Sequence, residues 1–123
     1  MWTYRQSDGF LLHNGVVVGE GYSGYGTDKN QPNDESVKNL GPIPHGTYTI
    51  GAPECVGAPG PHGPFVLPLT PNDTTTMFGR SGFKIHGDSI EHPGSASQGC
   101  IIMSKPVRVW IAQSDDHDLE VIA

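Results

Sequence analysis

Residues 83–102, FKIHGDSIEHPGSASQGCII, hold the pattern that decides the fold and the chemistry of this chain. The stretch begins with a β-rich run that ends on His86, and it closes on Cys100 after a segment rich in Gly, Pro and Ser. A strand followed by a turn-rich return brings the two ends together, so we expect His86 or His92 to lie near Cys100. Because an imidazole that takes the proton of a thiol makes cysteine a nucleophile, the stretch predicts Cys–His acyl transfer.

The residues on either side of this stretch predict further strands. The runs FLLH and VVVG are joined by Asn14-Gly15, the strongest two-residue signal for a β-hairpin, and Asp8-Gly9 marks a turn before them. Other β-rich runs are bounded by Gly, Pro, Asn and Ser, and they predict strands at 47–50, 65–69, 82–86 and 119–123.

Two short helices complete the predicted fold. One is expected over 34–39, and the other begins after Ser104, because apolar residues follow there at helical spacing: Val107, Trp110 and Ile111. A strand over 107–112 is the alternative for the second. The sequence therefore predicts one mostly β (β-rich α+β) domain over residues 1–123, a mostly antiparallel β-sandwich or flattened barrel with one or two short helices.

Composition and charge exclude two classes of partner. A net charge of −6 with only 7 scattered Lys and Arg residues leaves no basic surface for phosphates, so no nucleic-acid binding is expected. No apolar run approaches the roughly 20 residues of a membrane span, so no membrane insertion is expected. The first residues, MWTYRQSDGF, lack the charged and apolar regions of a signal peptide, which predicts that no ordinary secretory signal exports the chain.

Several roles remain open for Cys100 on the residues alone. It is a nucleophile, the partner of Cys55 in a disulfide, a buried core residue, or a metal ligand. In the metal interpretation His86 and His92 join Cys100, with His45 or His62 as a fourth ligand, which would make the protein a zinc-binding hydrolase. The spacing matches no established zinc pattern, so no metal or other cofactor is expected.

A protein without catalysis is a further alternative. The loops around GYSGYG, with Tyr22 and Tyr25, suit a cell-wall or protein-binding module. Such a module predicts no unusual thiol reactivity, whereas an activated Cys100 is expected to react faster than free cysteine near neutral pH.

The motif around Cys100 resembles a known family signature. His-Gly followed by a short loop and Ser-x-Gly-Cys resembles the catalytic domain of the L,D-transpeptidases, the YkuD-like fold, and GPIPHGTYTI resembles a strand of that fold. More closely, the segment from GYSGYG to TYTI, with MFGRSGFKIHGD and SQGCIIM, is similar to the DUF2778 family, which includes the Tlde1-type effectors of type VI secretion. This resemblance extends from about Tyr22 to Met103.

The resemblance implies an enzyme with a defined substrate. It implies a cysteine L,D-carboxypeptidase or L,D-transpeptidase that acts on peptidoglycan tetrapeptide stems at the bond between meso-diaminopimelate and D-Ala, and that exchanges D-amino acids. It also implies an antibacterial effector that carries no signal peptide, acts in the periplasm of the target cell, and is matched by a periplasmic immunity protein that plugs its cleft.

The resemblance assigns the reacting groups one by one. Cys100 is the expected nucleophile and His86 the general base, with the carbonyl of Gly87 holding the imidazole ring in the required tautomer. Ser97 and Gly99 are expected to shape the loop before the cysteine, and the Cys100 amide to donate to the oxyanion. The Gly-rich connection by itself predicts that the amides of Gln98, Gly99 and Cys100 face the developing oxyanion.

Other residues are expected around the substrate. Arg80 is expected to bind a substrate carboxylate, with a surface salt bridge as the alternative. His92 is expected to line the cleft. Gln98 stands where larger transpeptidases carry histidine, and Ile101 follows the cysteine where they carry arginine, so substrate contacts differ from theirs. The remaining assignments are structural: Cys55 as a structural thiol, surface or loop histidines, and core aromatics, namely His13, His45, His62, His117, Trp2, Trp110, Tyr4 and Tyr48.

Overall fold

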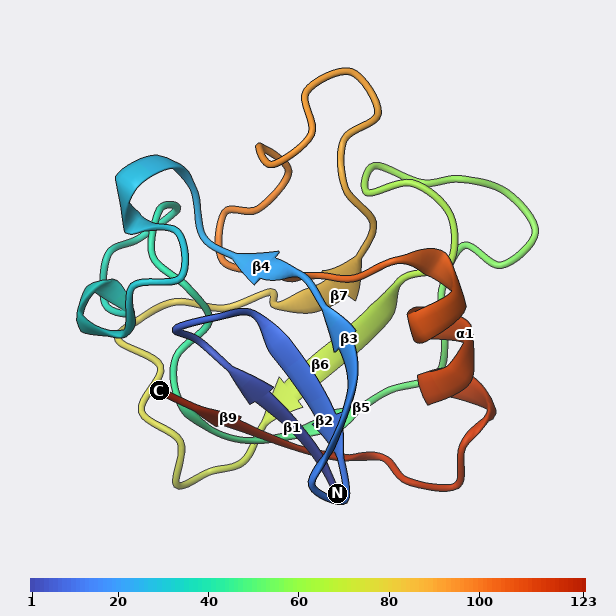
Figure 1. Ribbon diagram of the computed structural model, residues 1–123, viewed down its shortest axis with the longest axis horizontal. Coiled ribbons are helices and arrows are strands. Elements are labelled where there is room, and N and C mark those ends of the chain that lie inside the picture. The colour runs from blue at the N-terminus through green and yellow to red at the C-terminus, as the bar shows by residue number, and fades with distance from the viewer.

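A single curved sheet organises the computed structural model, which describes residues 1–123. Its nine strands follow the order β3-β2-β1-β9-β5-β6-β7-β8-β4 (Figure 1). The strands are β1 (Trp2–Arg5), β2 (Phe10–His13), β3 (Val16–Glu20), β4 (Tyr22–Ser23), β5 (Gly46–Ile50), β6 (Leu67–Pro71), β7 (Lys84–His86), β8 (Ile101–Ile102) and β9 (Asp118–Ile122). The mostly β fold with a barrel-like sheet is thus confirmed.

The sheet nearly closes into a barrel, because its two edge strands are neighbours in sequence. Only Gly21 separates β3 from β4, which lie at opposite ends of the strand order. A side chain on Gly21 would clash with the carbonyl of Ile102 on β8, so only glycine fits at this junction. Pairing is antiparallel except between β1 and β9 and between β7 and β8.

The first hairpin forms as the sequence predicts. Asn14 and Gly15 have φ angles of 51° and 86°, the pair of positive values that a type I′ turn requires. Of the other strands, β5, β6, β7 and β9 fall at or within two residues of the expected runs, whereas β1, β4 and β8 were not expected.

The core fills the inside of the barrel. A cluster of 15 buried residues draws on β1, β2, β5, β6, β7, β8, β9 and the helix. Trp2 and Tyr4 alternate with half-buried residues along β1, and Ile85 on β7 pairs with Ile101 on β8 in the same cluster. The sheet therefore turns one side of β7 and β8 toward the core and leaves the other side free for a site.

The helix after Ser104 is confirmed, and the alternative strand is wrong. α1 (Lys105–Gln113) has Ser104 at its N-cap position, although the Ser104 side chain makes no capping hydrogen bond, and it carries Pro in its first turn. Its buried residues are Arg108 and Ile111, with Val107 packed against the core. Trp110 was expected in the core and is 49% exposed, because it lies at the edge of the buried face of α1.

No helix has the length and apolarity to cross a membrane.

The helix expected over 34–39 is wrong. The chain instead forms two short 3₁₀ helices, η1 (Gly26–Asp28) and η2 (Pro32–Asp34), followed by turns. In an α-helix the carbonyl of Glu35 would accept from the amide of Asn39, but here it accepts a hydrogen bond from the buried guanidinium of Arg80. A tertiary contact thus overrides the local helix signal.

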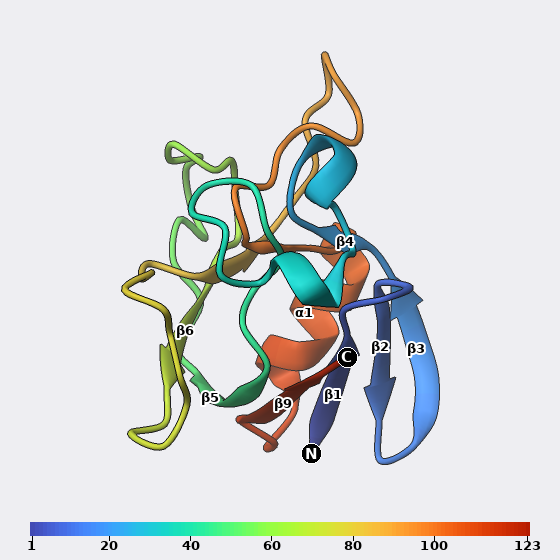
Figure 2. The ribbon, with the colours of Figure 1, turned by 90° about the vertical axis from the view of Figure 1, so that its left-hand side faces the viewer.

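The long loops gather at one end of the barrel. In both views the loop between β7 and β8 and the loop before β6 lie at the end of the molecule away from the N-terminus (Figures 1 and 2). These two loops flank the end of β7 where His86 stands, so this end is where a site is expected.

Candidate active site

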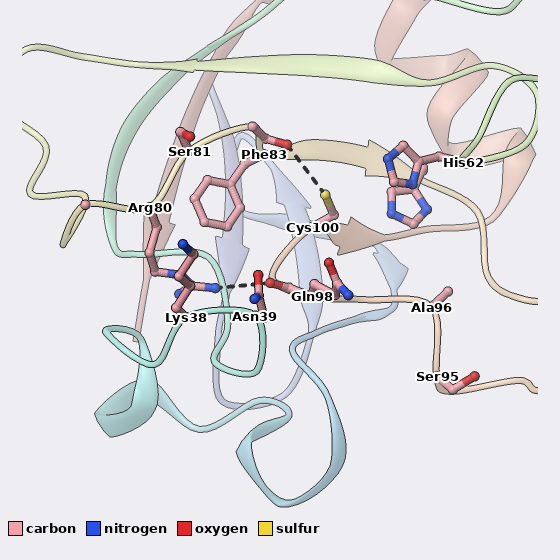
Figure 3. A pocket seen from close by; sticks show the side chains of 13 residues that line it. Lys38, Asn39, His62, Arg80, Ser81, Phe83, Ser95, Ala96, Gln98 and Cys100 are labelled. Atoms are coloured by element: carbon pink, nitrogen blue, oxygen red, sulfur yellow. Dashed lines mark hydrogen bonds between the residues drawn. The ribbon is translucent and has the colours of Figure 1, made fainter.

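The thiol and the imidazole singled out in the sequence line one cavity. This cavity, of about 470 Å³, is open at the barrel end, and Figure 3 shows Cys100 between Phe83 on one side and His62 on the other. Its lining residues are Lys38, Asn39, His62, Gly79, Arg80, Ser81, Gly82, Phe83, His86, Ser95, Ala96, Gln98 and Cys100. None of them is Asp or Glu, in a chain whose net charge is −6.

Strand pairing explains why the two groups share a face. Ile85 pairs with Ile101 in parallel register, and both side chains point into the core. Successive side chains along a strand point to opposite faces, so His86 and Cys100, each one residue from this pair, both point away from the core. The parallel β7–β8 pair is therefore the element that builds the site.

Burial keeps the Cys100 thiol protonated at rest. Burial raises the pKa of the thiol, whereas the backbone N–H of Lys84 and the charges of Lys84 and Arg80 act in the opposite direction. The Sγ atom lies 4.0 Å from the carbonyl oxygen of Gly82 (dashed line in Figure 3). The thiol thus needs a base at the moment of attack.

His86 is held as a neutral imidazole of one tautomer. It is 3% exposed, and burial lowers its pKa, although the hydrogen bond to Gly87 raises it in part. Nδ1 lies 2.8 Å from the carbonyl oxygen of Gly87, which accepts only a hydrogen bond, so Nδ1 carries the proton. Nε2 is then the unprotonated nitrogen, which can accept a proton.

Ser97 and Gly99 fix the loop before the thiol. The Ser97 hydroxyl is fully buried, accepts from the amides of Gly24 and Gly99, and donates to the carbonyl of Cys100 at 2.6 Å. Gly99 has φ 128°, and a Cβ there would lie 2.5 Å from Nη2 of Arg80. The backbone N–H of Cys100 donates to no protein acceptor and remains free for a ligand oxygen.

Arg80 differs from both expectations. It is 6% exposed and forms no salt bridge, so the surface ion pair is wrong. Its two terminal nitrogens donate to four backbone carbonyls, at Glu35, Gly41, Pro42 and Gln98. Because both terminal nitrogens already donate to backbone carbonyls, the guanidinium has no free pair of N–H groups for bidentate binding of a substrate carboxylate. It instead connects residues 35–42 to the loop before Cys100 through hydrogen bonds.

His92 lies outside the cavity, and the metal interpretation loses support with it. His92 is exposed and lines neither the Cys100 cavity nor the one beyond His86, because its loop projects outward. No group of three His, Cys, Asp or Glu residues is placed to hold a metal ion. Cys55 and Cys100 are both free thiols, so the disulfide is absent as well.

Nine of the 13 lining residues were not among the predicted site residues, and three of these nine carry nitrogen-bearing side chains. His62, expected at the surface, stacks on His86 with ring centroids 4.7 Å apart. Lys38 and Asn39 come from the segment that was expected to be helical, and they form the rim near Arg80 (Figure 3). No local pattern identifies them, because long-range packing alone brings their loops to the thiol.

Fold and site together define a barrel-like β protein with a thiol and an imidazole in one open, acid-free cavity. The sequence model of the Tlde1 domain matches residues 18–121, and the chain belongs to this family. The match confirms the family resemblance seen in the motifs, and the family is one of peptidoglycan-targeting effectors. A comparison with curated proteins finds no significant match.

Proposed function

We propose that this protein is a cysteine-dependent peptidoglycan-modifying enzyme. Its substrate would be the tetrapeptide stem, cut at the bond between meso-diaminopimelate and D-Ala, with hydrolysis or D-amino acid exchange as the outcome. The observation that carries the proposal is the shared cavity of Cys100 and His86, with Nδ1 of His86 hydrogen-bonded to Gly87. The acid-free lining, with Lys38 on its rim, suits a peptide that ends in a carboxylate.

The chemistry proceeds through a thioester. Nε2 of His86 takes the thiol proton as Sγ of Cys100 attacks the stem carbonyl, and the free Cys100 amide donates to the developing oxyanion. His86 then gives the proton to the departing amino group of D-Ala. Water resolves the thioester in the carboxypeptidase reaction, and the amino group of another D-amino acid resolves it in the exchange reaction. Both outcomes use the same residues and need no cofactor.

Purified muropeptides test this proposal. Wild type should release D-Ala from tetrapeptide stems, and added D-amino acid should appear in the product masses. Cys100→Ala and His86→Ala should each lose nearly all turnover, and the double variant should be little worse, because groups that act as a unit are not additive. Cys55→Ala is the matched control for a thiol outside the cavity. Full turnover by Cys100→Ala would refute the assignment.

A binding module remains the alternative. It would bind muropeptides without changing their mass, and it would bind them equally well as Cys100→Ala. The cavity around a half-buried thiol and a tautomer-fixed imidazole favours the enzyme, because neither feature is needed for binding alone.

We further propose that the protein is an antibacterial effector of type VI secretion that acts in the periplasm. A periplasmic immunity protein would then protect the producing cell by filling the Cys100 cavity. Membership of a family of peptidoglycan-targeting effectors supports this view.

A further inference from the structure

An exposed histidine covers a buried one beside the thiol. His62 is exposed, whereas His86 is 3% exposed, and their rings stack 4.7 Å apart with planes inclined by 27°. His62 therefore lies between one face of the His86 ring and solvent. The pair also forms the wall between the Cys100 cavity and a second cavity of about 560 Å³, since both residues line each of them.

The loop that carries His62 is fastened to the rest of the molecule. Gly60 and Gly63 exchange two backbone hydrogen bonds on either side of His62 and form a tight turn. Behind the turn, the buried guanidinium of Arg108 donates to the carbonyls of Pro64 and Phe65. His62 thus lies in a turn that Arg108, a residue of α1, holds in place through hydrogen bonds to Pro64 and Phe65.

The same arginine also packs under the residue that orients His86. A Cβ on Gly87 would lie 2.9 Å from Nη1 of Arg108, so the guanidinium contacts the backbone next to His86 directly. Nη1 donates to the carbonyl of Met103 as well. Arg108 therefore sets the distance between the His62 turn and the strand that bears His86.

We propose that His62 is a positioning residue of the site, whose ring covers His86, excludes water from that face, and keeps the imidazole neutral and oriented for Cys100. This role rests on the proposed thiol–imidazole chemistry. It needs a flat ring at position 62 and does not need the ring nitrogens to react. His62 touches the base and is not assigned a contact with the reacting atoms.

Most of the charged groups around His86 lower its pKa, as its burial under His62 does. His62 on its turn and Arg108 on α1 both disfavour a second proton on the ring, whereas Asp88, two residues along the chain, favours it weakly. Burial is the largest cause of the lowered pKa of His86. Removing the cover is therefore expected to raise that pKa and to reduce the neutral fraction at acidic pH.

Two substitutions distinguish a His62 ring that only covers His86 from a His62 ring that takes part in the reaction. His62→Phe keeps a flat ring, and His62→Ala removes it. NMR titration of the His86 ring, assigned by comparison with His86→Gln, should give the highest titration midpoint for His86 in His62→Ala and a smaller rise of that midpoint in His62→Phe.

The pH profile of kcat/KM gives a second measurement. His62→Ala should lose activity mainly below pH 7, about tenfold for each pH unit by which the His86 midpoint rises. His62→Phe should stay within about threefold of wild type at pH 7, and His117→Ala, an exposed histidine that lines neither cavity, should match wild type.

The outcomes distinguish this inference from the proposed function. If wild type turns over muropeptides and His62→Ala keeps both its His86 midpoint and its acidic activity, the inference is wrong and the function stands. If His62→Phe is as impaired as His62→Ala, a ring nitrogen is required and a cover is refuted. If wild type turns over nothing, the function fails, and the NMR titration still decides whether His62 shields His86.

Discussion

Cys100 and His86 line one cavity, and both groups are uncharged at rest. Burial is the largest cause in each case, and it acts against the thiolate and against the imidazolium. The pair therefore differs from a preformed ion pair, in which the thiol is already ionised at neutral pH. The expectation from sequence, that Cys100 reacts faster than free cysteine near pH 7, does not follow from this structure.

Alkylation kinetics test the resting state of the thiol. In the Cys55→Ala protein, where Cys100 is the single thiol, the rate of iodoacetamide modification should rise with pH and reach its midpoint above the value of about 8.5 for free cysteine. The direction follows from the raised pKa of the buried thiol. A midpoint below pH 7 would show a thiolate–imidazolium pair instead.

Gly99, next to the thiol, leaves no room for a side chain. A methyl group there meets Nη2 of Arg80 and the ring of Phe83, at 2.5 and 2.6 Å, in addition to the unfavourable φ of 128°. We expect Gly99→Ala to lower the free energy of unfolding by about 1–3 kcal/mol and to displace Cys100 enough to abolish turnover. Urea unfolding and muropeptide turnover measure the two effects.

Gly57→Ala supplies the comparison for this prediction. Gly57 has no atom within 4 Å of its ideal Cβ, and its φ is not positive. It should therefore unfold like wild type, and equal stability of Gly99→Ala and Gly57→Ala would show that the loop before Cys100 tolerates a side chain.

Among the helices and strands, the sequence predicts correctly those elements that depend on interactions between residues close together in the chain. The Asn14-Gly15 hairpin depends on turn chemistry and the helix after Ser104 on the spacing of its apolar residues, and both form as expected. The pairing of His86 with Cys100 in one cavity also follows from a short strand–loop–strand return. β4 and β8 have two residues each, too short for a periodicity, and only their pairing with neighbours defines them.

The missing helix over 34–39 and the exposed Trp110 share a physical cause, which is the buried arginines. Arg80 draws backbone carbonyls of residues 35–42 toward itself and prevents the expected helix, and Arg108 takes the buried position on α1 in place of Trp110. Their partners are main-chain oxygens from distant loops, which no local pattern can identify. The same contacts bring Lys38 and His62 to the cavity.

Arg108 is expected to be a main support of the helix and the His62 turn. Arg108→Met would leave the carbonyls of Phe65, Met103 and Pro64 without a donor, and buried carbonyls without partners cost about 1–3 kcal/mol each. We expect the free energy of unfolding to fall by at least about 2 kcal/mol in urea titrations.

The matching control is an arginine at the surface. Arg5 pairs with Asp8 where both side chains are about one-third exposed, so Arg5→Met should change stability little. If the two substitutions destabilised the protein equally, the backbone contacts of Arg108 would be of no special importance.

At the scale of the whole molecule, the proposed substrate fixes where the protein should be harmful. Expressed in the cytoplasm of a Gram-negative host, it should not slow growth, and directed to the periplasm by a fused signal peptide it should cause lysis or rounding. Cys100→Ala in the same fusion should be harmless. Growth curves at matched protein levels measure this, and equal toxicity in both compartments would indicate another target.

The position of β1 within the sheet has a consequence for the boundaries of the fold. The family match covers residues 18–121, yet β1 lies between β2 and β9, and β1 and β2 supply Trp2, Tyr4 and Leu11 to the core. Losing the burial of these three side chains costs about 5–9 kcal/mol, comparable with the whole stability of a domain. A fragment of residues 18–121 should therefore stay unfolded by circular dichroism, and supplying residues 1–17 as a separate peptide should restore the fold, as in a split protein. A folded, active fragment would show that the family segment is autonomous.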